Sequence, residues 1–216
     1  MTRREQTIAR ILDGAAAAFA KAGFAGTSME EIAAAAGVSK LLLYRDFAGK
    51  KELYQAVLER TRDRIVEQVP RQASNAALRA LISTAREDPD GFTLLFRHAV
   101  REPEFAGYAT SLTDRDIRAA EQLMRRIEPD PTMRRWAAEI TVDITYQSII
   151  TWLEHGDPSR DEEFFRRLLA VNRAAAKPQP DSARDAASTP ATGVNRTAAK
   201  PQADSAPARV AQPDGD

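Results

Sequence analysis

The chain has 216 residues, enough for one ordinary domain or two small ones, and its 31 basic and 31 acidic residues give a net charge of zero. Any nucleic-acid or membrane partner must therefore be bound through a local charged patch, because the molecule as a whole has no electrostatic bias. The absence of cysteine excludes disulfides and thiolate zinc sites, no run approaches the roughly 18 apolar residues of a membrane span, and we expect a soluble, cytoplasmic protein with no membrane partner.

The first part of the chain predicts a long amphipathic helix followed by a short second helix. Apolar residues recur at helical spacing here and nearly everywhere else, and no strand pattern is convincing. The first helix ends at Gly23 and Gly26. Ser28 and Glu31 have the spacing of a capping box, which predicts a second helix over residues 29–36.

A turn and a series of further helices follow. Gly37 makes the turn, Ser39 caps a third helix over residues 39–46, and a fourth helix over residues 50–69 is stopped by a proline. Three Asp-Pro pairs farther along place an aspartate at a helix cap and a proline at the first helical position. The remaining helices are predicted near residues 75–87, 89–101, 104–128, 131–155 and 159–174. The sequence therefore predicts an all-α chain of about nine helices.

The composition changes at residue 174, where large aliphatic side chains become scarce. The segment VNRAAAKPQPDSA at 171–183 recurs as VNRTAAKPQADSA at 194–206. Repeats of this length can stack into a solenoid, but this unit has almost no apolar face to bury. We therefore expect residues 174–216 to form a disordered tail.

Residues 28–46 have the arrangement of a helix-turn-helix, in which a support helix, a tight turn and a recognition helix follow one another. Leu43 and Phe47 are four residues apart on the third helix and share one face. Together with Val38 they can close a small three-helix core. The opposite face of the third helix is then free to enter the major groove of DNA.

The three leucines of the third helix are apolar on more sides than a short helix can bury. If Leu43 points inward, Leu41, Leu42 and Arg45 point into solvent or into a groove. An aliphatic side chain in the major groove can contact a thymine methyl group, and an arginine can reach a guanine edge. The alternative is that Leu41 and Leu42 pack on the fourth helix.

Polar groups that suit DNA phosphates surround this helix. Helix N-termini present free N–H groups to phosphate oxygens, and the nearby side chains add charge and hydroxyl donors. Besides the three outward residues above, the candidate DNA contacts are Thr27, Ser28, Ser39, Lys40, Tyr44 and Lys50.

The segment TSMEEIAAAAGVSKLLLYRDFAGKKELY, residues 27–54, resembles the DNA-binding signature of the TetR family of transcriptional repressors. The matching positions are Ile32, Ala33, Ala36, Gly37, Val38, Ser39, Leu43, Tyr44, Phe47, Lys50 and Leu53, with Ser28 at the usual threonine position. The resemblance implies a DNA-binding domain at residues 1–48 and a helical effector-binding and dimerisation domain at residues 49–173. It also implies a homodimeric repressor that a small-molecule effector releases from double-stranded operator DNA.

Two features depart from that family pattern. Leu41 and Leu42 stand where small or polar residues are usual, and Asp46 stands where histidine or tyrosine is common. Asp46 would be repelled by phosphate, but it could accept a hydrogen bond from a cytosine or pair with Arg45 or a neighbouring lysine. The operator sequence therefore cannot be transferred from other members.

Aromatic and polar residues of the later helices are the candidates for an effector pocket. The aromatic candidates are Phe92, Phe96, Tyr108, Tyr146 and Trp152, and His98 and Gln147 could supply polar groups. The alternative is that these aromatic rings only fill the core. The last two helices also carry a broad apolar face that we expect to pair with a second copy, unless it only closes the core of the monomer.

Other function classes find little support in the sequence. It contains two histidines, His98 and His155, and no metal-binding HExxH motif, glycine-rich phosphate loop or paired Glu-x-x-His sites. We therefore expect no catalytic residue, metal or cofactor. A helical enzyme or small-molecule carrier, and a DNA-binding regulator that no ligand controls, are the alternatives.

Overall fold

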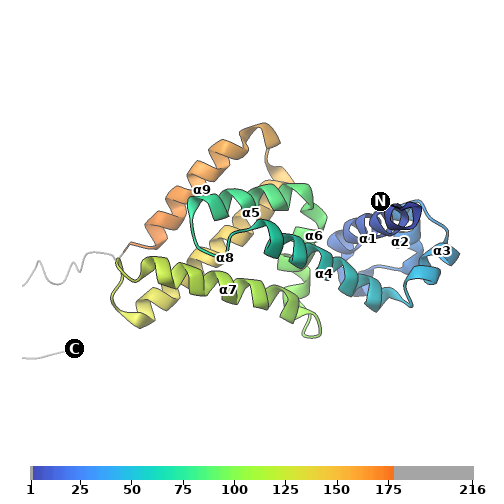
Figure 1. Ribbon diagram of the computed structural model, residues 1–216, viewed down its shortest axis with the longest axis horizontal. Coiled ribbons are helices and arrows are strands. Elements are labelled where there is room, and N and C mark those ends of the chain that lie inside the picture. Colours follow the sequence, from blue (N-terminus) through green and yellow to red (C-terminus); the bar gives the residue numbers. More distant parts are fainter. Residues whose placement is uncertain (1, 178–216) are drawn as a thin grey trace, which may run out of the picture. The chain divides into compact units, whose positions relative to one another are not determined.

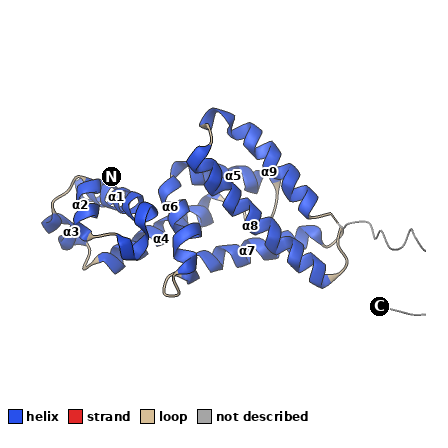
Figure 2. Ribbon diagram, turned by 180° about the vertical axis from the view of Figure 1, so that it is seen from behind, coloured by secondary structure: helices blue, strands red, loops and turns tan. Residues whose placement is uncertain are grey.

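The computed structural model describes residues 2–177, and every regular element in that range is a helix (Figures 1 and 2). The α-helices are α1 (Arg3–Gly26), α2 (Met29–Ala36), α3 (Lys40–Asp46), α4 (Lys50–Gln68), α5 (Asn75–Glu87), α6 (Pro89–Thr93), α7 (Ala106–Met124), α8 (Pro131–His155) and α9 (Asp161–Ala175). Three shorter helical segments are the π-helix η1 (Leu94–His98) and the 3₁₀ helices η2 (Ala99–Arg101) and η3 (Pro158–Arg160). The described range thus confirms the predicted all-α fold, and most of the predicted tail, residues 178–216, lies outside it.

The local signals at the start of α2 form as the sequence predicts. The Ser28 hydroxyl accepts a hydrogen bond from the Glu31 N–H at 3.2 Å, and the Glu31 carboxylate accepts one from the Ser28 N–H at 2.7 Å. At the other end, Gly37 has φ of 62° and its N–H bonds back to the last turn of the helix. Because only glycine adopts this left-handed conformation without strain, Gly37 fixes the turn between α2 and α3.

The segment predicted as one helix over residues 89–101 is a succession of three helix types. After α6, the Ala99 N–H bonds to the Leu94 carbonyl, five residues back, and the chain then tightens into a 3₁₀ turn. Residues 91–96 are all buried, so this segment lies inside the molecule and has no solvent-facing stripe. Apolar spacing alone does not separate an α-helix from a buried π-helix, which is why the prediction missed the change.

The predicted end of the first helix at Gly26 is confirmed, and one other boundary shifts. Gly23 has φ of 69° and kinks α1, after which the helix resumes as far as Gly26. The predicted helix over residues 104–128 is shorter in the structure, because α7 begins at Ala106 and ends at Met124.

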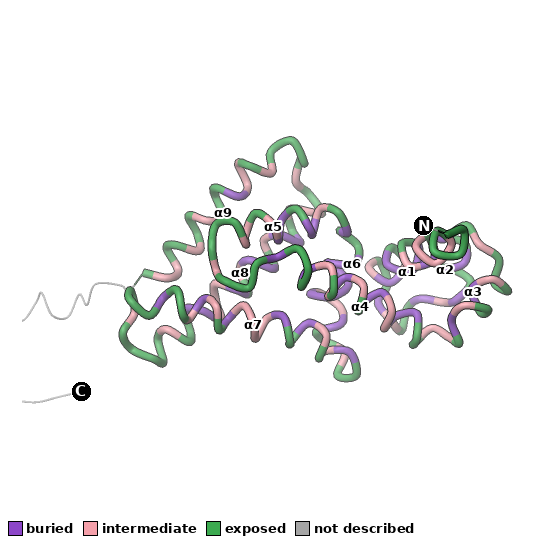
Figure 3. The backbone as a smooth tube through the Cα atoms, in the orientation of Figure 1, coloured by how far each residue is buried: buried purple, intermediate pink, exposed green. Residues whose placement is uncertain are grey.

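Helices α1 to α3 and the first half of α4 surround the N-terminal part of the apolar core, and Figure 3 colours the buried positions of these helices purple. The side chains with no exposed area in it include Ile11, Ala15, Phe19, Ile32, Leu43, Leu53 and Val57. Helices α1 and α2 approach closely where Gly14 faces Ala36, because a Cβ atom on Gly14 would lie 2.5 Å from the Ala36 backbone nitrogen. The absence of a side chain at Gly14 therefore lets the support helix pack against α1.

Helix α4 connects this N-terminal core to the remaining helices. It contacts α1 at one end and α5, α6 and α7 along the rest of its length (Figure 1). The described residues, 2–177, accordingly belong to one compact unit. A domain boundary after residue 48 stays a prediction, because α4 packs both against α1 and against α5, α6 and α7.

Candidate functional site

The α3 helix has one buried face and one exposed face. Leu43 has no exposed area and Phe47 is 8% exposed, so both belong to the N-terminal core. Leu41 is 84% exposed and Tyr44 is 46% exposed on the outer side. Leu42 is half-buried. Of the two alternatives for Leu41, the structure therefore shows the outward position and not packing on α4.

Both cations of α3 are paired with acidic side chains. Lys40 forms an ion pair with Glu30 of α2. The Arg45 guanidinium donates to the adjacent Asp46 carboxylate at 2.7 Å, and Arg4 of α1 donates to the same carboxylate at 3.3 Å. The hydrogen bond from Arg45 lowers the pKa of Asp46 below its ordinary value, so that carboxylate is charged at neutral pH. Asp46 thus pairs with Arg45, as one of the predicted alternatives had it, and also with Arg4, which was not predicted.

Of the predicted DNA contacts that carry an aliphatic hydroxyl group, two serines cap helices at the surface and one threonine is buried. Ser28 and Ser39 accept hydrogen bonds from the first turns of α2 and α3 and lie at the surface. Thr27 is 3% exposed, and its hydroxyl lies 2.8 Å from the Gly23 carbonyl, to which it donates. The prediction that Thr27 contacts DNA through its side chain does not fit this position, because the hydroxyl points into the protein.

Lys50 lies beside the α2 N-terminus. Its ammonium group donates to the Thr27 carbonyl at 2.9 Å and lies 4.6 Å from the centre of the Phe24 ring. Lys50 and Tyr44 line a shallow hollow with residues 25–31. An ammonium group has three donors, so Lys50 can hold the end of α1 and still offer donors to an anion in this hollow.

Three of the predicted effector residues meet in the interior. The Phe96 ring stacks on the Tyr146 ring at 4.0 Å, and Phe92 lies 4.8 Å from Phe96. Tyr146 is 3% exposed, and its hydroxyl donates to the Asp116 carboxylate at 2.7 Å. This interior cluster joins η1 on one side to α7 and α8 on the other.

The other predicted effector residues lie elsewhere. Trp152 stacks on Phe164 at 4.9 Å and its indole N–H donates to Asp161 at 2.6 Å, so it holds α8 to α9. Tyr108 donates to Glu59 of α4 at 3.1 Å. Gln147 is exposed, and His98 lies next to Gly23 at the kink of α1. These four residues therefore lie outside the interior aromatic cluster.

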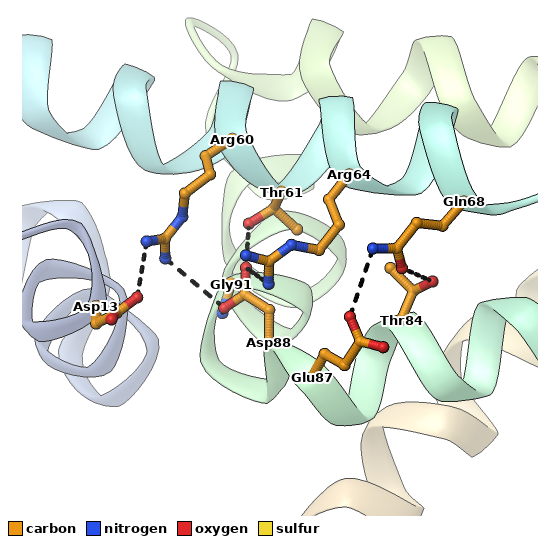
Figure 4. A network of polar contacts seen from close by, with 9 residues as sticks. All are labelled: Asp13, Arg60, Thr61, Arg64, Gln68, Thr84, Glu87, Asp88 and Gly91. Carbon is orange, nitrogen blue, oxygen red and sulfur yellow. Dashed lines mark hydrogen bonds and ion pairs between the residues drawn. The ribbon is translucent and has the colours of Figure 1, made fainter. Parts of the chain in front are cut away.

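A polar network between α1, α4 and α6, which the sequence did not reveal, is drawn in Figure 4. Asp88 is 8% exposed, accepts from the Thr61 hydroxyl at 3.0 Å, and caps α6 by accepting from the Gly91 N–H at 3.1 Å. Arg60 donates to Asp13 of α1 at 2.7 Å and lies 3.8 Å from Asp88. Arg60 thus links α1 of the N-terminal core to the start of the segment that carries Phe92 and Phe96.

The network continues along α4. Arg64 forms a second ion pair with Asp88 at 3.5 Å, and Gln68 donates to Glu87 at 3.4 Å and accepts from the Thr84 hydroxyl at 2.8 Å (Figure 4). The Asp88-Pro89 pair was recognisable in the sequence as a helix cap. The sequence did not show that arginines of α4 would pair with this cap, because the pairing depends on how the helices pack.

Comparison with known proteins decides the family. The sequence profile of the bacterial regulatory proteins, tetR family, matches residues 11–57. The HTH-type transcriptional activator FasR of Mycolicibacterium smegmatis is 32% identical over 166 residues, which cover 72% of this chain and 76% of that relative. The chain belongs to the TetR family.

Further similarities agree with membership of the TetR family. The fold is shared with a TetR-like transcriptional regulator from Rhodococcus sp. RHA1, with a TM-score of 0.66, 24% identity and coverage of 88% of this chain and 100% of that chain. The HTH-type transcriptional repressor SCO4008 of Streptomyces coelicolor is 45% identical over 56 residues, 26% of this chain and 29% of that relative. This TetR-family chain is thus a DNA-binding transcriptional regulator, and its relatives include both an activator and a repressor.

None of the helices within residues 2–177 combines the length and the hydropathy of a membrane-spanning segment. In the same range, no group of three or more His, Asp or Glu side chains is arranged to hold a metal ion.

Proposed function

We propose that this TetR-family regulator binds operator DNA through the exposed face of α3 and acts as a repressor that a small-molecule effector releases. The observation that carries the DNA-binding part is the exposure of Leu41 on a helix whose other face is anchored by fully buried Leu43. An apolar side chain held out in this way can contact a thymine methyl group in the major groove of a duplex. Ser28, Ser39, Tyr44 and Lys50 lie around it and are proposed to contact phosphates.

The contacts of α1 with α6 and η1 support effector control. Helix α1 contacts both α6 and η1, and Arg60 ties Asp13 of α1 to Asp88 at the start of α6. An effector that binds better when the interior aromatic cluster is rearranged would shift α6 and η1. Such a shift would then be passed to α1 and alter the position of α3.

We further propose a homodimer, in which a second copy covers apolar side chains of α8 and α9. Trp136 is 53% exposed and Val171 is 47% exposed, whereas Ile149, Ile150 and Phe165 are buried in the core of the monomer. Part of the broad apolar face predicted from the sequence is therefore used internally, and the exposed part is available to a partner. A two-fold dimer would place two α3 helices in successive major grooves, about 34–36 Å apart.

A gel-shift titration with the DNA upstream of the chain's own gene, followed by footprinting, tests this function. We expect specific binding whose logarithmic affinity falls linearly with the logarithm of the salt concentration. Adding candidate effectors should weaken the complex. Specific binding that no small molecule changes would favour the ligand-independent regulator. Failure to bind any genomic fragment would contradict the assignment and favour a helical carrier or enzyme.

A further inference from the structure

Arg115 of α7 is a charged side chain whose end is buried without partners. Its side chain is 16% exposed, and its Nε atom donates to the Asp116 carboxylate at 2.7 Å. The two terminal nitrogens, Nη1 and Nη2, are shielded from solvent and have no hydrogen-bond partner within the described part of the chain. The hydrogen bond from Nε therefore orients the guanidinium, while Nη1 and Nη2 are free to bind another group.

The Asp116 carboxylate connects Arg115 to the interior aromatic cluster. Its second oxygen accepts the hydrogen bond from Tyr146 at 2.7 Å, and Tyr146 stacks on Phe96 of η1. Burial and the negative charge of Asp116 raise the pKa of Tyr146, so its hydroxyl keeps its proton and stays the donor. One carboxylate thus positions both the arginine and the tyrosine from opposite sides.

The free nitrogens make this site selective for an anion. An arginine in a protein keeps its positive charge and cannot become neutral to escape burial. A buried donor without a partner destabilises the protein, and it does so more strongly when it is charged. A carboxylate would satisfy both terminal nitrogens at once through two parallel hydrogen bonds. A neutral ligand could not offset the charge in this way.

We propose that the effector is an amphipathic monocarboxylate whose carboxylate binds Nη1 and Nη2 of Arg115 and whose apolar body lies against the rings of Tyr146 and Phe96. Phe96 belongs to the π-helix η1, and π-helical turns recur at functional sites. Because the free nitrogens are shielded from solvent, the ligand reaches them only when α7 and its neighbours move. The ligand therefore binds the moved arrangement more tightly, which is the condition for shifting a conformational equilibrium.

A panel of monocarboxylates from benzoate to dodecanoate, each paired with its neutral primary amide, tests the proposal by isothermal titration calorimetry. We expect at least one carboxylate to bind the full-length protein about tenfold or more tightly than its amide, because a charged hydrogen bond is at stake. Arg115→Met should abolish this preference, and Arg115→Lys should retain part of it. Arg118→Met, on an exposed arginine of the same helix, should leave the preference unchanged.

The outcomes separate this inference from the proposed effector control on which its regulatory meaning rests. Equal binding of every acid and amide, no binding by any compound, or a preference that survives Arg115→Met would overturn the carboxylate site. Circular dichroism tests whether each variant is folded. If Arg115→Met does not fold, the acid-over-amide preference of Arg115→Lys decides whether Arg115 binds the carboxylate. If a carboxylate binds through Arg115 but leaves operator affinity unchanged in a gel shift, the site stands and effector release fails.

Discussion

Leu41 is the residue through which the DNA-binding surface is best tested, because it is 84% exposed on α3. If Leu41 contacts a thymine as proposed, we expect operator affinity to fall about fourfold when that thymine is replaced by uracil, which lacks only the methyl group. Leu41→Ala should bind the thymine duplex more weakly and no longer distinguish it from the uracil duplex. Fluorescence anisotropy with the footprinted operator, substituted one thymine at a time, measures both effects.

Leu123→Ala is the matched control for this experiment, since Leu123 is 60% exposed on α7. It should discriminate between thymine and uracil as well as the unmodified protein does. A Leu41→Ala variant that still distinguishes every thymine from uracil would show that Leu41 does not read a methyl group.

Gly14 allows α1 and α2 to approach closely because it has no Cβ atom. Gly14→Ala would place a Cβ atom 2.5 Å from the Ala36 backbone nitrogen, and α1 and α2 would have to separate. We expect a loss of about 1–3 kcal/mol in the free energy of unfolding, measured by urea denaturation. In Gly107→Ala the added Cβ meets nothing within 4 Å, so this control should be neutral or stabilising by up to about 1 kcal/mol. Equal effects of the two substitutions would disprove the close approach.

At the scale of elements, Asp46 joins α3 to α1 by holding Arg45 and Arg4. The side chain of Asp46 is 1% exposed, whereas those of Arg45 and Arg4 are 56% and 72% exposed. Because the pKa of Asp46 is lowered, the charged clamp is present above the ordinary value of 3.8 and is lost only as the pH falls through the lowered pKa. Operator binding near neutral pH should therefore not depend on the titration of Asp46.

Asp46→Asn should release these two arginines toward the DNA backbone. We expect tighter binding to all duplexes and a salt dependence steeper by about one in the logarithmic slope for each arginine that gains a phosphate. Asp63→Asn is the control, because Arg62 and Asp63 form the same adjacent pair at 2.7 Å on α4. A salt slope that is unchanged by Asp46→Asn would mean that the arginines do not approach the backbone when released.

The whole molecule is proposed to act as a dimer, and two exposed valines test this. Val171 of α9 is 47% exposed and Val66 of α4 is 41% exposed. Val171→Glu would bury a charge against the second copy, so we expect the dimer dissociation constant to rise about a hundredfold. Sedimentation equilibrium measures this dissociation constant. Operator affinity should fall as the dimer weakens.

Val66→Glu should leave both the dimer and operator binding intact, since Val66 lies outside the proposed dimer face. If the two glutamate variants behave alike, or if the unmodified protein is a monomer at operator-binding concentrations, the proposed dimer is wrong.

Much of the fold could be predicted because its signals are local. Caps at Ser28 and Ser39, the left-handed turn at Gly37, and the four-residue spacing of Leu43 and Phe47 each act within one or two helical turns. The same short-range pattern indicated the helix-turn-helix and the family resemblance, and it indicated the outward position of Leu41.

The sequence by itself therefore determined that this protein is helical, where most helices begin and end, and which end resembles a DNA-binding domain. Tertiary structure alone decided that Thr27 points inward, that Asp46 clamps two arginines, and that Phe96 and Tyr146 meet while Trp152 and Tyr108 lie elsewhere. It also decided that Arg115 is buried with its fork unpaired. Periodicity tells which face of a helix is apolar, but pairing between distant helices depends on their packing, to which many weak contacts contribute together.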